Sequence, residues 1–187
     1  MKFWTLQRRE VVDKALKQGL YQPDFEKSEY TEYNENLKDI YDFILESFNN
    51  LNKTEYPGLI FAFTATDNQS IIEMDDYEFF RDYCKANEEP LEPLWKHYKD
   101  SDMVVVEVEY DLELNPLFIE YNDYQLLGIP PERWGYPYNF FDDCPRIVGN
   151  IQNGVVQGSL FPSGFIQAHL PNLTKENIVA VHPWFVL

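Results

Sequence analysis

The chain has 187 residues, of which 44% are hydrophobic and 17% aromatic, so it can bury one hydrophobic core and is not a disordered chain. Its 32 acidic and 15 basic residues give a formal net charge of −17 at pH 7. Binding to a nucleic-acid backbone depends on Lys and Arg side chains that neutralise phosphates, so this charge argues against direct nucleic-acid binding. The acidity either serves solubility, or it forms an acidic face that meets a basic partner or imitates DNA.

The cysteines and the hydrophobic stretches predict a cytoplasmic protein. Cys84 and Cys144 lie far apart and form no Cys-x-x-Cys spacing, which is typical of buried thiols in a reducing compartment. The first residues lack the apolar run of a signal peptide. No stretch reaches the roughly 18 apolar residues that a membrane span needs, so we expect no membrane insertion.

The chain opens with a strand and a helix. Lys2–Gln7 alternates in polarity, which predicts a strand. Arg8–Gln18 carries apolar residues at helical spacing, and Gly19 suits the position after the last helical turn. The acidic and aromatic stretch Tyr21–Glu35 indicates a loop or a short irregular helix.

The middle of the chain alternates helices with one central strand. Apolar residues at positions i, i+3, i+4 and i+7 predict a helix over Glu35–Leu51. The nearly continuous apolar run Leu59–Thr66 predicts a buried strand that ends in a turn at Asp67–Ser70. Two further helices are expected, over Asp75–Lys85 and within Pro90–Tyr98.

The second half begins with another strand, Asp102–Asp111, followed by a short helix over Tyr121–Leu127. The aromatic and proline-rich segment Pro130–Pro145 indicates a loop packed over the core. Three glycines in Ile147–Gly158 predict a hairpin that turns at Asn153–Gly154.

Two extended apolar segments, Phe165–Leu170 and Ile178–Val181, close the chain around one polar turn. The fold class that follows is α+β. We expect a single domain over residues 1–187, in which N-terminal helices pack on a mainly antiparallel sheet.

Motifs for metals, nucleotides and hydrolases are missing. The three histidines show no His-x-His or His-Glu-x-x-His spacing, so we expect no dedicated metal site. Acidic pairs such as Asp75–Asp76 and Asp142–Asp143 have the carboxylates that hold Mg²⁺ or Ca²⁺, but 32 acidic residues produce such pairs by composition, and a solvated turn is the favoured interpretation. The glycines are spaced for turns, and Ser163–Gly164 lacks the Gly-x-Ser-x-Gly frame.

The remaining candidates are uncharged polar residues on the terminal strands. Thr5 and Gln7 are two residues apart, and so are Gln167 and His169, so within each pair both side chains point to the same face of a strand. If the two strands lie close together, the four groups line one ligand-binding surface. Otherwise Thr5 and Gln7 face solvent, and His169 is a core or rim histidine whose hydrogen bonds are satisfied.

Both ends of the chain resemble the bacterial domain-of-unknown-function family 3841. The resemblance covers about a third of the chain, and the family brings no established activity with it. The segments that carry it are Phe3–Gln7, Gly19, Val106–Val108, Ile166–Leu170, Glu176–Ile178 and Trp184–Phe185.

The opening Phe3–Leu20 is also similar to the start of ADP-ribosyltransferase-like domains of the DNA-targeting toxin type. That resemblance implies an ADP-ribosyltransferase-like fold in which the first strand helps to hold the nicotinamide end of NAD, with Thr5, Gln7 and Arg8 beside the ligand. It also implies a catalytic Glu on a late strand, but Gly164–Leu170 contains none. Gln167 cannot replace a carboxylate that stabilises a positively charged centre, which leaves transferase activity in doubt.

The first functional hypothesis is an uncharacterised bacterial or phage protein that binds a nucleotide-like, NAD-like small ligand between the first and last strands. Thr5, Gln7, Gln167 and His169 would contact that ligand. The alternative is an acidic interaction module, for example an inhibitor of a basic nucleic-acid-handling protein. Its basis is the net charge and the acidic stretch Asp24–Glu35.

Overall fold

A computed structural model of the chain describes residues 1–187 except 29–34, 100–101, 114–115, 129–137 and 157. The described chain folds around a seven-stranded sheet in the order β6-β7-β3-β1-β5-β9, with β4 paired to β3. Every pairing in this sheet is antiparallel. The strands are β1 (Lys2–Arg8), β3 (Ile60–Thr66), β4 (Ile71–Ile72), β5 (Met103–Glu109), β6 (Leu117–Glu120), β7 (Phe165–Leu170) and β9 (Ile178–Pro183).

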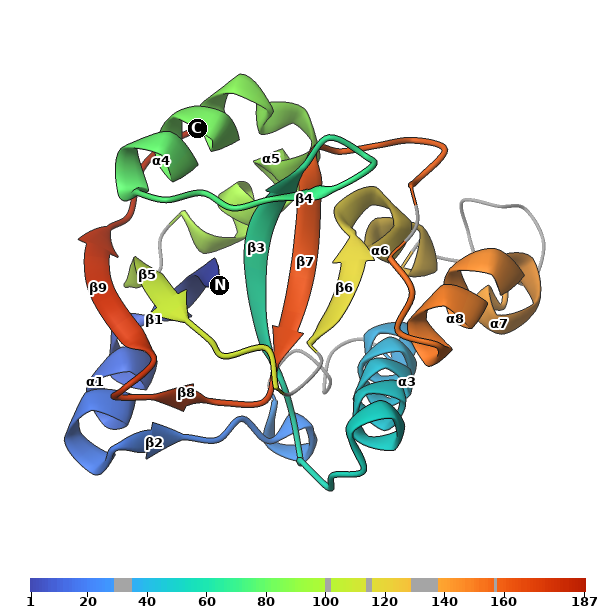
Figure 1. Cartoon of the computed structure of the whole chain (residues 1–187), viewed down its shortest axis with the longest axis horizontal. Helices are drawn as coiled ribbons and strands as arrows, with labels where there is room; N and C mark the ends of the chain where they lie inside the picture. Colours follow the sequence, from blue (N-terminus) through green and yellow to red (C-terminus); the bar gives the residue numbers. More distant parts are fainter. Residues whose placement is uncertain (29–34, 100–101, 114–115, 129–137, 157) are drawn as a thin grey trace.

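The sheet is nearly divided between β1 and β3. These strands share only two paired positions, Trp4 with Phe63 and Thr5 with Ala62. On its other side β1 pairs with β5 along its whole length. Figure 1 shows the result, with β3, β7 and β6 forming one group of strands and β1, β5 and β9 another.

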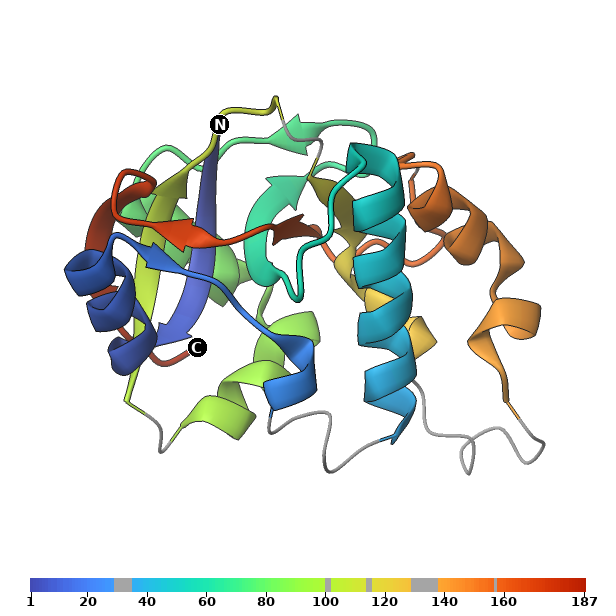
Figure 2. The same ribbon diagram turned by 90° about the horizontal axis from the view of Figure 1, so that it is seen from below.

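One face of the sheet carries α1 (Arg9–Gln18) and a small second sheet of β2 (Leu20–Tyr21) and β8 (Leu173–Thr174), as Figure 2 shows. Val12 and Ala15 of α1 pack there against Phe3 of β1. Gly19 ends α1 with a φ of +84°, a left-handed conformation that suits glycine. The sequence prediction for this terminus is therefore confirmed.

The opposite face is covered by α4 (Tyr77–Ala86) and α5 (Glu88–Tyr98), which Figure 1 shows above the sheet. Trp4 is fully buried there and stacks on Phe80, with ring centroids 5.0 Å apart. Its indole N–H donates to the carbonyl oxygen of Met74 at 2.9 Å, which ties β1 to the segment before α4. The first strand therefore lies in the middle of the core.

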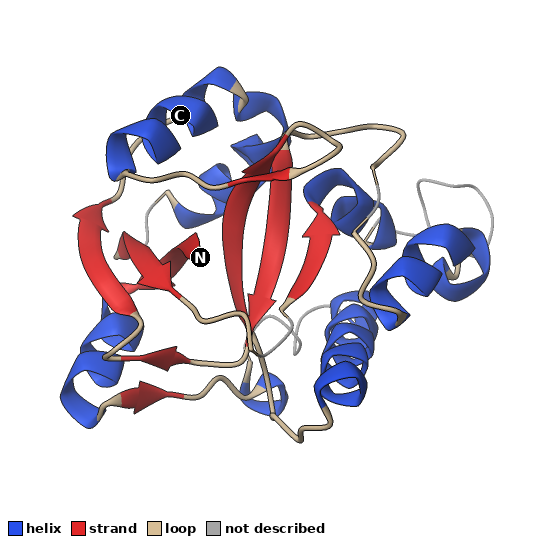
Figure 3. Ribbon diagram, in the orientation of Figure 1, coloured by secondary structure: helices blue, strands red, loops and turns tan. Residues whose placement is uncertain are grey.

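A second part of the core lies at the β6 end. There α3 (Glu35–Asn52) and α8 (Pro145–Gln152) pack on Leu117 and Ile119 of β6, and α6 (Tyr121–Leu127) follows β6 directly. The short helices are α7 (Phe140–Asp143) and the 3-10 helix η1 (Phe25–Lys27). Figure 3 shows how helices surround the β6 side of the sheet.

At the other end of the sheet, β9 pairs with β5 and has no strand partner on its outer side among the described residues. Residues along β9 alternate between half-buried and exposed, and Val179 and Val181 are among the exposed ones. The sheet therefore ends in an open, apolar edge strand.

The expected fold class is confirmed, because the described chain forms an α+β domain with a mainly antiparallel sheet. The expected hairpin over Ile147–Gly158 is wrong. Pro145 begins a helix there, and Ile147, Val148 and Ile151 form its buried face. Gly154 has a φ of +62° and ends that helix, so the Asn-Gly pair is a helix stop rather than a hairpin turn.

Half of the predicted loop Pro130–Pro145, residues 130–137, lies outside the described residues, and Phe140–Asp143 within it is helical. Part of Tyr21–Glu35 lies outside them as well. Four strands, β2, β4, β6 and β8, were not predicted from the sequence. Within the described residues, no helix combines the length and the hydropathy that crossing a membrane requires.

Candidate functional site

Thr5 and Gln7 of β1 bond to each other and to the neighbouring strand. The Thr5 hydroxyl is buried and donates to the carbonyl oxygen of Phe61 at 2.7 Å. The Gln7 side-chain amide donates to the Thr5 hydroxyl at 2.7 Å. Thr5 is the last residue of β1 that pairs with β3. These two side chains therefore hold β1 and β3 together where their ladder ends.

Gln167 and His169 of β7 lie on the other face of the sheet. Thr5 pairs with Ala62, and Ala62 pairs with Ala168, so Thr5 shares the face of Ala168. Gln167 and His169 flank Ala168 and therefore point to the opposite face. The expectation that the four side chains line one surface is wrong, because β3 separates the strands and the pairs face opposite ways. Their role in ligand binding stays a prediction.

Gln167 and His169 are buried polar residues whose hydrogen bonds are incomplete. The exposed fraction is 4% for Gln167 and 0% for His169. Gln167 Oε1 and both ring nitrogens of His169 have no hydrogen-bond partner in the described structure. A buried polar group without a partner costs about 1–3 kcal/mol, and proteins usually satisfy such groups with protein, water or a ligand. Three such atoms on one strand make Gln167 and His169 the first candidates for a ligand-binding site.

Aromatic rings surround His169. The ring of Phe61 meets the imidazole edge-on with centroids 4.8 Å apart, and the ring of Tyr124 from α6 lies 6.3 Å away. Burial lowers the pKa of His169 to about 3, so the imidazole is neutral at pH 7. Burial also raises the pKa of Tyr124 well above its usual value, with a further contribution from the hydroxyl of Tyr41. Gln167 and His169 thus form an uncharged hydrogen-bonding site that is lined by aromatic rings.

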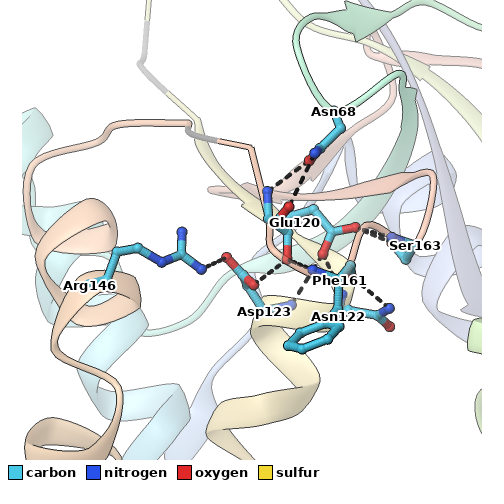
Figure 4. Close-up of polar contacts among 8 residues, drawn as sticks. Asn68, Glu120, Asn122, Asp123, Arg146, Phe161 and Ser163 are labelled. Carbon is cyan, nitrogen blue, oxygen red and sulfur yellow. Dashed lines mark hydrogen bonds and ion pairs between the residues drawn. The ribbon is translucent and has the colours of Figure 1, made fainter.

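A second polar cluster, centred on two buried carboxylates, lies at the start of α6 (Figure 4). Glu120 Oε2 accepts from the backbone N–H groups of Asn122 at 2.8 Å and Asp123 at 3.2 Å, and so caps α6. Glu120 Oε1 accepts from the backbone N–H of Ser163 at 2.5 Å and from the Ser163 hydroxyl. One carboxylate thus joins a helix terminus to a distant loop.

Asp123 joins the same loop to α8. Its carboxylate accepts from Arg146 Nη2 at 3.0 Å and from the Ser159 hydroxyl at 2.6 Å. The side chain of Asn68, from the turn after β3, bonds both backbone groups of Ser159, accepting from its N–H at 2.7 Å and donating to its carbonyl at 3.1 Å. Asn122 donates to the Phe161 carbonyl at 2.9 Å. Residues 159–163, called the anchored loop below, are therefore fixed from three directions.

The sequence analysis did not identify this cluster. Glu120 and Asp123 are three residues apart around the first turn of a helix, a spacing that many of the 32 acidic residues produce by chance. The signal that distinguishes them is context, because Glu120 ends an otherwise apolar strand and directly precedes a helix. Of the acidic pairs that the sequence suggested, Asp76 caps α4 by accepting from the Phe79 backbone N–H at 2.8 Å.

Comparisons of this chain with protein-family models, with curated proteins and with solved structures find no match.

Proposed function

We propose that the chain binds a small, nucleotide-like ligand of the NAD type through Gln167 and His169 of β7. The observation that supports this proposal most is the group of three unpartnered buried atoms on that strand. Leucine or phenylalanine at the same positions would remove the desolvation cost, so two polar residues there are expensive unless something bonds them.

The unpartnered atoms match a primary carboxamide. Gln167 Oε1 is an acceptor, and a neutral imidazole offers one N–H donor and one acceptor nitrogen. A carboxamide such as that of nicotinamide has two N–H donors and one carbonyl acceptor, so its groups complement those of the site. Because His169 is neutral, the pair suits the uncharged carboxamide group of the nicotinamide rather than the phosphates of NAD.

In the structure described here the pair is sealed from solvent, so binding must displace the aromatic rings that pack on it. Phe61 and Tyr124 contact the imidazole and are both only half-buried. We therefore expect slow association and a ligand stacked between aromatic side chains.

A thermal-shift experiment tests the proposal. NAD and nicotinamide at millimolar concentration should raise the unfolding temperature, whereas ADP-ribose, which lacks the carboxamide, should raise it less. His169→Phe keeps an aromatic ring and removes both nitrogens. This variant should be at least as stable as the wild type without ligand and should lose the response to nicotinamide.

Thr5→Val is the matched control, since it alters the opposite face of the sheet and should keep the full ligand response. Two results would overturn the assignment: no shift of the wild-type protein with NAD or nicotinamide, or an unchanged shift in His169→Phe.

A further inference from the structure

The anchored loop displays two large apolar side chains to solvent. Leu160 is 79% exposed and Phe161 is 67% exposed. The backbone that carries them is held by its neighbours: Ser159 by Asn68 and Asp123, and Phe161 by Asn122 and by the Ser159 hydroxyl, to which its N–H donates at 3.1 Å. Figure 4 shows Phe161 beside Asn122 in this network.

Holding the anchored loop in place costs free energy. Two carboxylates are buried in the cluster, and each buried charge is costly unless it is fully hydrogen-bonded. The hydrogen bonds of these carboxylates fix a loop whose large apolar side chains, Leu160 and Phe161, are themselves exposed to solvent. An exposed apolar pair on a rigid backbone is the arrangement of a pre-organised contact in a protein interface.

A polar hollow of about 580 Å³ adjoins the loop. Pro162 and Ser163 of the loop form one side of it, and Asn122 and Gln125 of α6 and the start of α5 form the rest. The start of α5 contributes two exposed acids, Glu88 and Glu89, and no Lys or Arg is among the described residues that line the hollow. The surface beside Leu160 and Phe161 is therefore concave and negatively charged.

Charge decides between the candidate occupants. The net charge of −17 makes a second copy of this chain a poor partner, because like charges repel across an interface. A basic segment is attracted by the net negative charge of the molecule, and at the hollow it can form ion pairs with Glu88 and Glu89. An uncharged apolar segment would use Leu160 and Phe161 but leave Glu88 and Glu89 without partners.

We propose that the anchored loop and the adjoining hollow form a docking surface for a basic protein segment, which packs an apolar side chain on Leu160 and Phe161 and places a Lys or Arg side chain beside Glu88 and Glu89. This surface lies outside the Gln167–His169 site and does not depend on it. It locates the basic partner that the acidic composition suggests.

Selection from a library of random peptides displayed on phage tests the surface directly. The selected peptides should be enriched in Lys or Arg together with aromatic or aliphatic residues. A labelled synthetic peptide of the selected sequence should bind less tightly as salt is added. Phe161→Ser should weaken its binding about tenfold or more, and the double variant Glu88→Gln, Glu89→Gln should weaken it and reduce the salt dependence.

Val179→Ser is the matched control, because Val179 is an exposed valine on β9 at the other end of the sheet, and it should leave peptide affinity unchanged. Circular dichroism verifies that each variant is folded. The proposal is overturned if no peptide is enriched, if the enriched peptides carry no basic residue, or if the selected peptide binds Phe161→Ser as tightly as wild type.

Discussion

His169 is the residue whose surroundings differ most from what its sequence context suggests. A histidine within an apolar strand is expected to find at least one hydrogen-bond partner, yet neither ring nitrogen of His169 has one in the described structure. The sequence identified Gln167 and His169 as neighbours on one face, which the structure confirms. It could not show that the face is sealed by aromatic rings, because those rings come from β3 and α6.

The low pKa of His169 predicts a specific pH dependence of stability. The unfolded chain binds a proton at His169 below about pH 6.5, whereas the folded protein does so only near pH 3. The unfolded state therefore gains protons first, and wild-type stability relative to His169→Phe should fall by about 1.4 kcal/mol per pH unit between pH 6 and pH 4. Urea unfolding of both proteins across this range measures the difference. Parallel pH profiles would contradict a buried, neutral His169.

At the scale of elements, the sequence predicted each long helix and strand to within two or three residues, because their apolar periodicity reports directly which side is buried. The prediction was wrong where one short sequence pattern is compatible with two structures. Asn153–Gly154 fits a hairpin turn and a helix stop equally well, and the helical spacing of Ile147 and Ile151 decides between them. The four-residue strand β6 is too short to show a period.

At the junction of β1 and β3, the Thr5 side chain adds a hydrogen bond to the two paired backbone positions. Thr5→Val keeps the shape of the residue but removes the donor to the Phe61 carbonyl and the acceptor for Gln7. Because the carbonyl stays buried without this bond, we expect a loss of about 1–3 kcal/mol in the free energy of unfolding. Denaturant titration measures it. Leu6→Val, at a half-buried neighbouring position without a side-chain hydrogen bond, serves as a control for a conservative change in the same strand. Equal losses in both variants would argue against a role of the Thr5 hydrogen bond at the junction.

On the scale of the whole molecule, the charge of −17 opposes compaction. Ion pairs on the described surface, such as Lys17–Asp13 and Lys96–Glu92, are exposed and each contribute little. Raising ionic strength from about 10 mM to about 150 mM shortens the screening length from about 30 Å to about 8 Å. The repulsion among the excess acidic side chains should weaken more than the attraction within these ion pairs. We therefore expect the unfolding temperature to rise by about 3 °C. Calorimetry at the two salt concentrations tests this, and a lower unfolding temperature at high salt would mean that attractive pairs dominate.

The open strand β9 gives the acidity a further consequence. Its valines and the outer edge of its backbone offer another chain a place to extend the sheet, and Ile178–Pro183 contains no Asp, Glu, Lys or Arg that would oppose such pairing. Mutual repulsion between molecules is then the colloidal barrier that keeps such edges apart. That barrier disappears near the isoelectric point of about 4.4, where neutralised molecules are free to stack edge to edge into precipitates with cross-strand order.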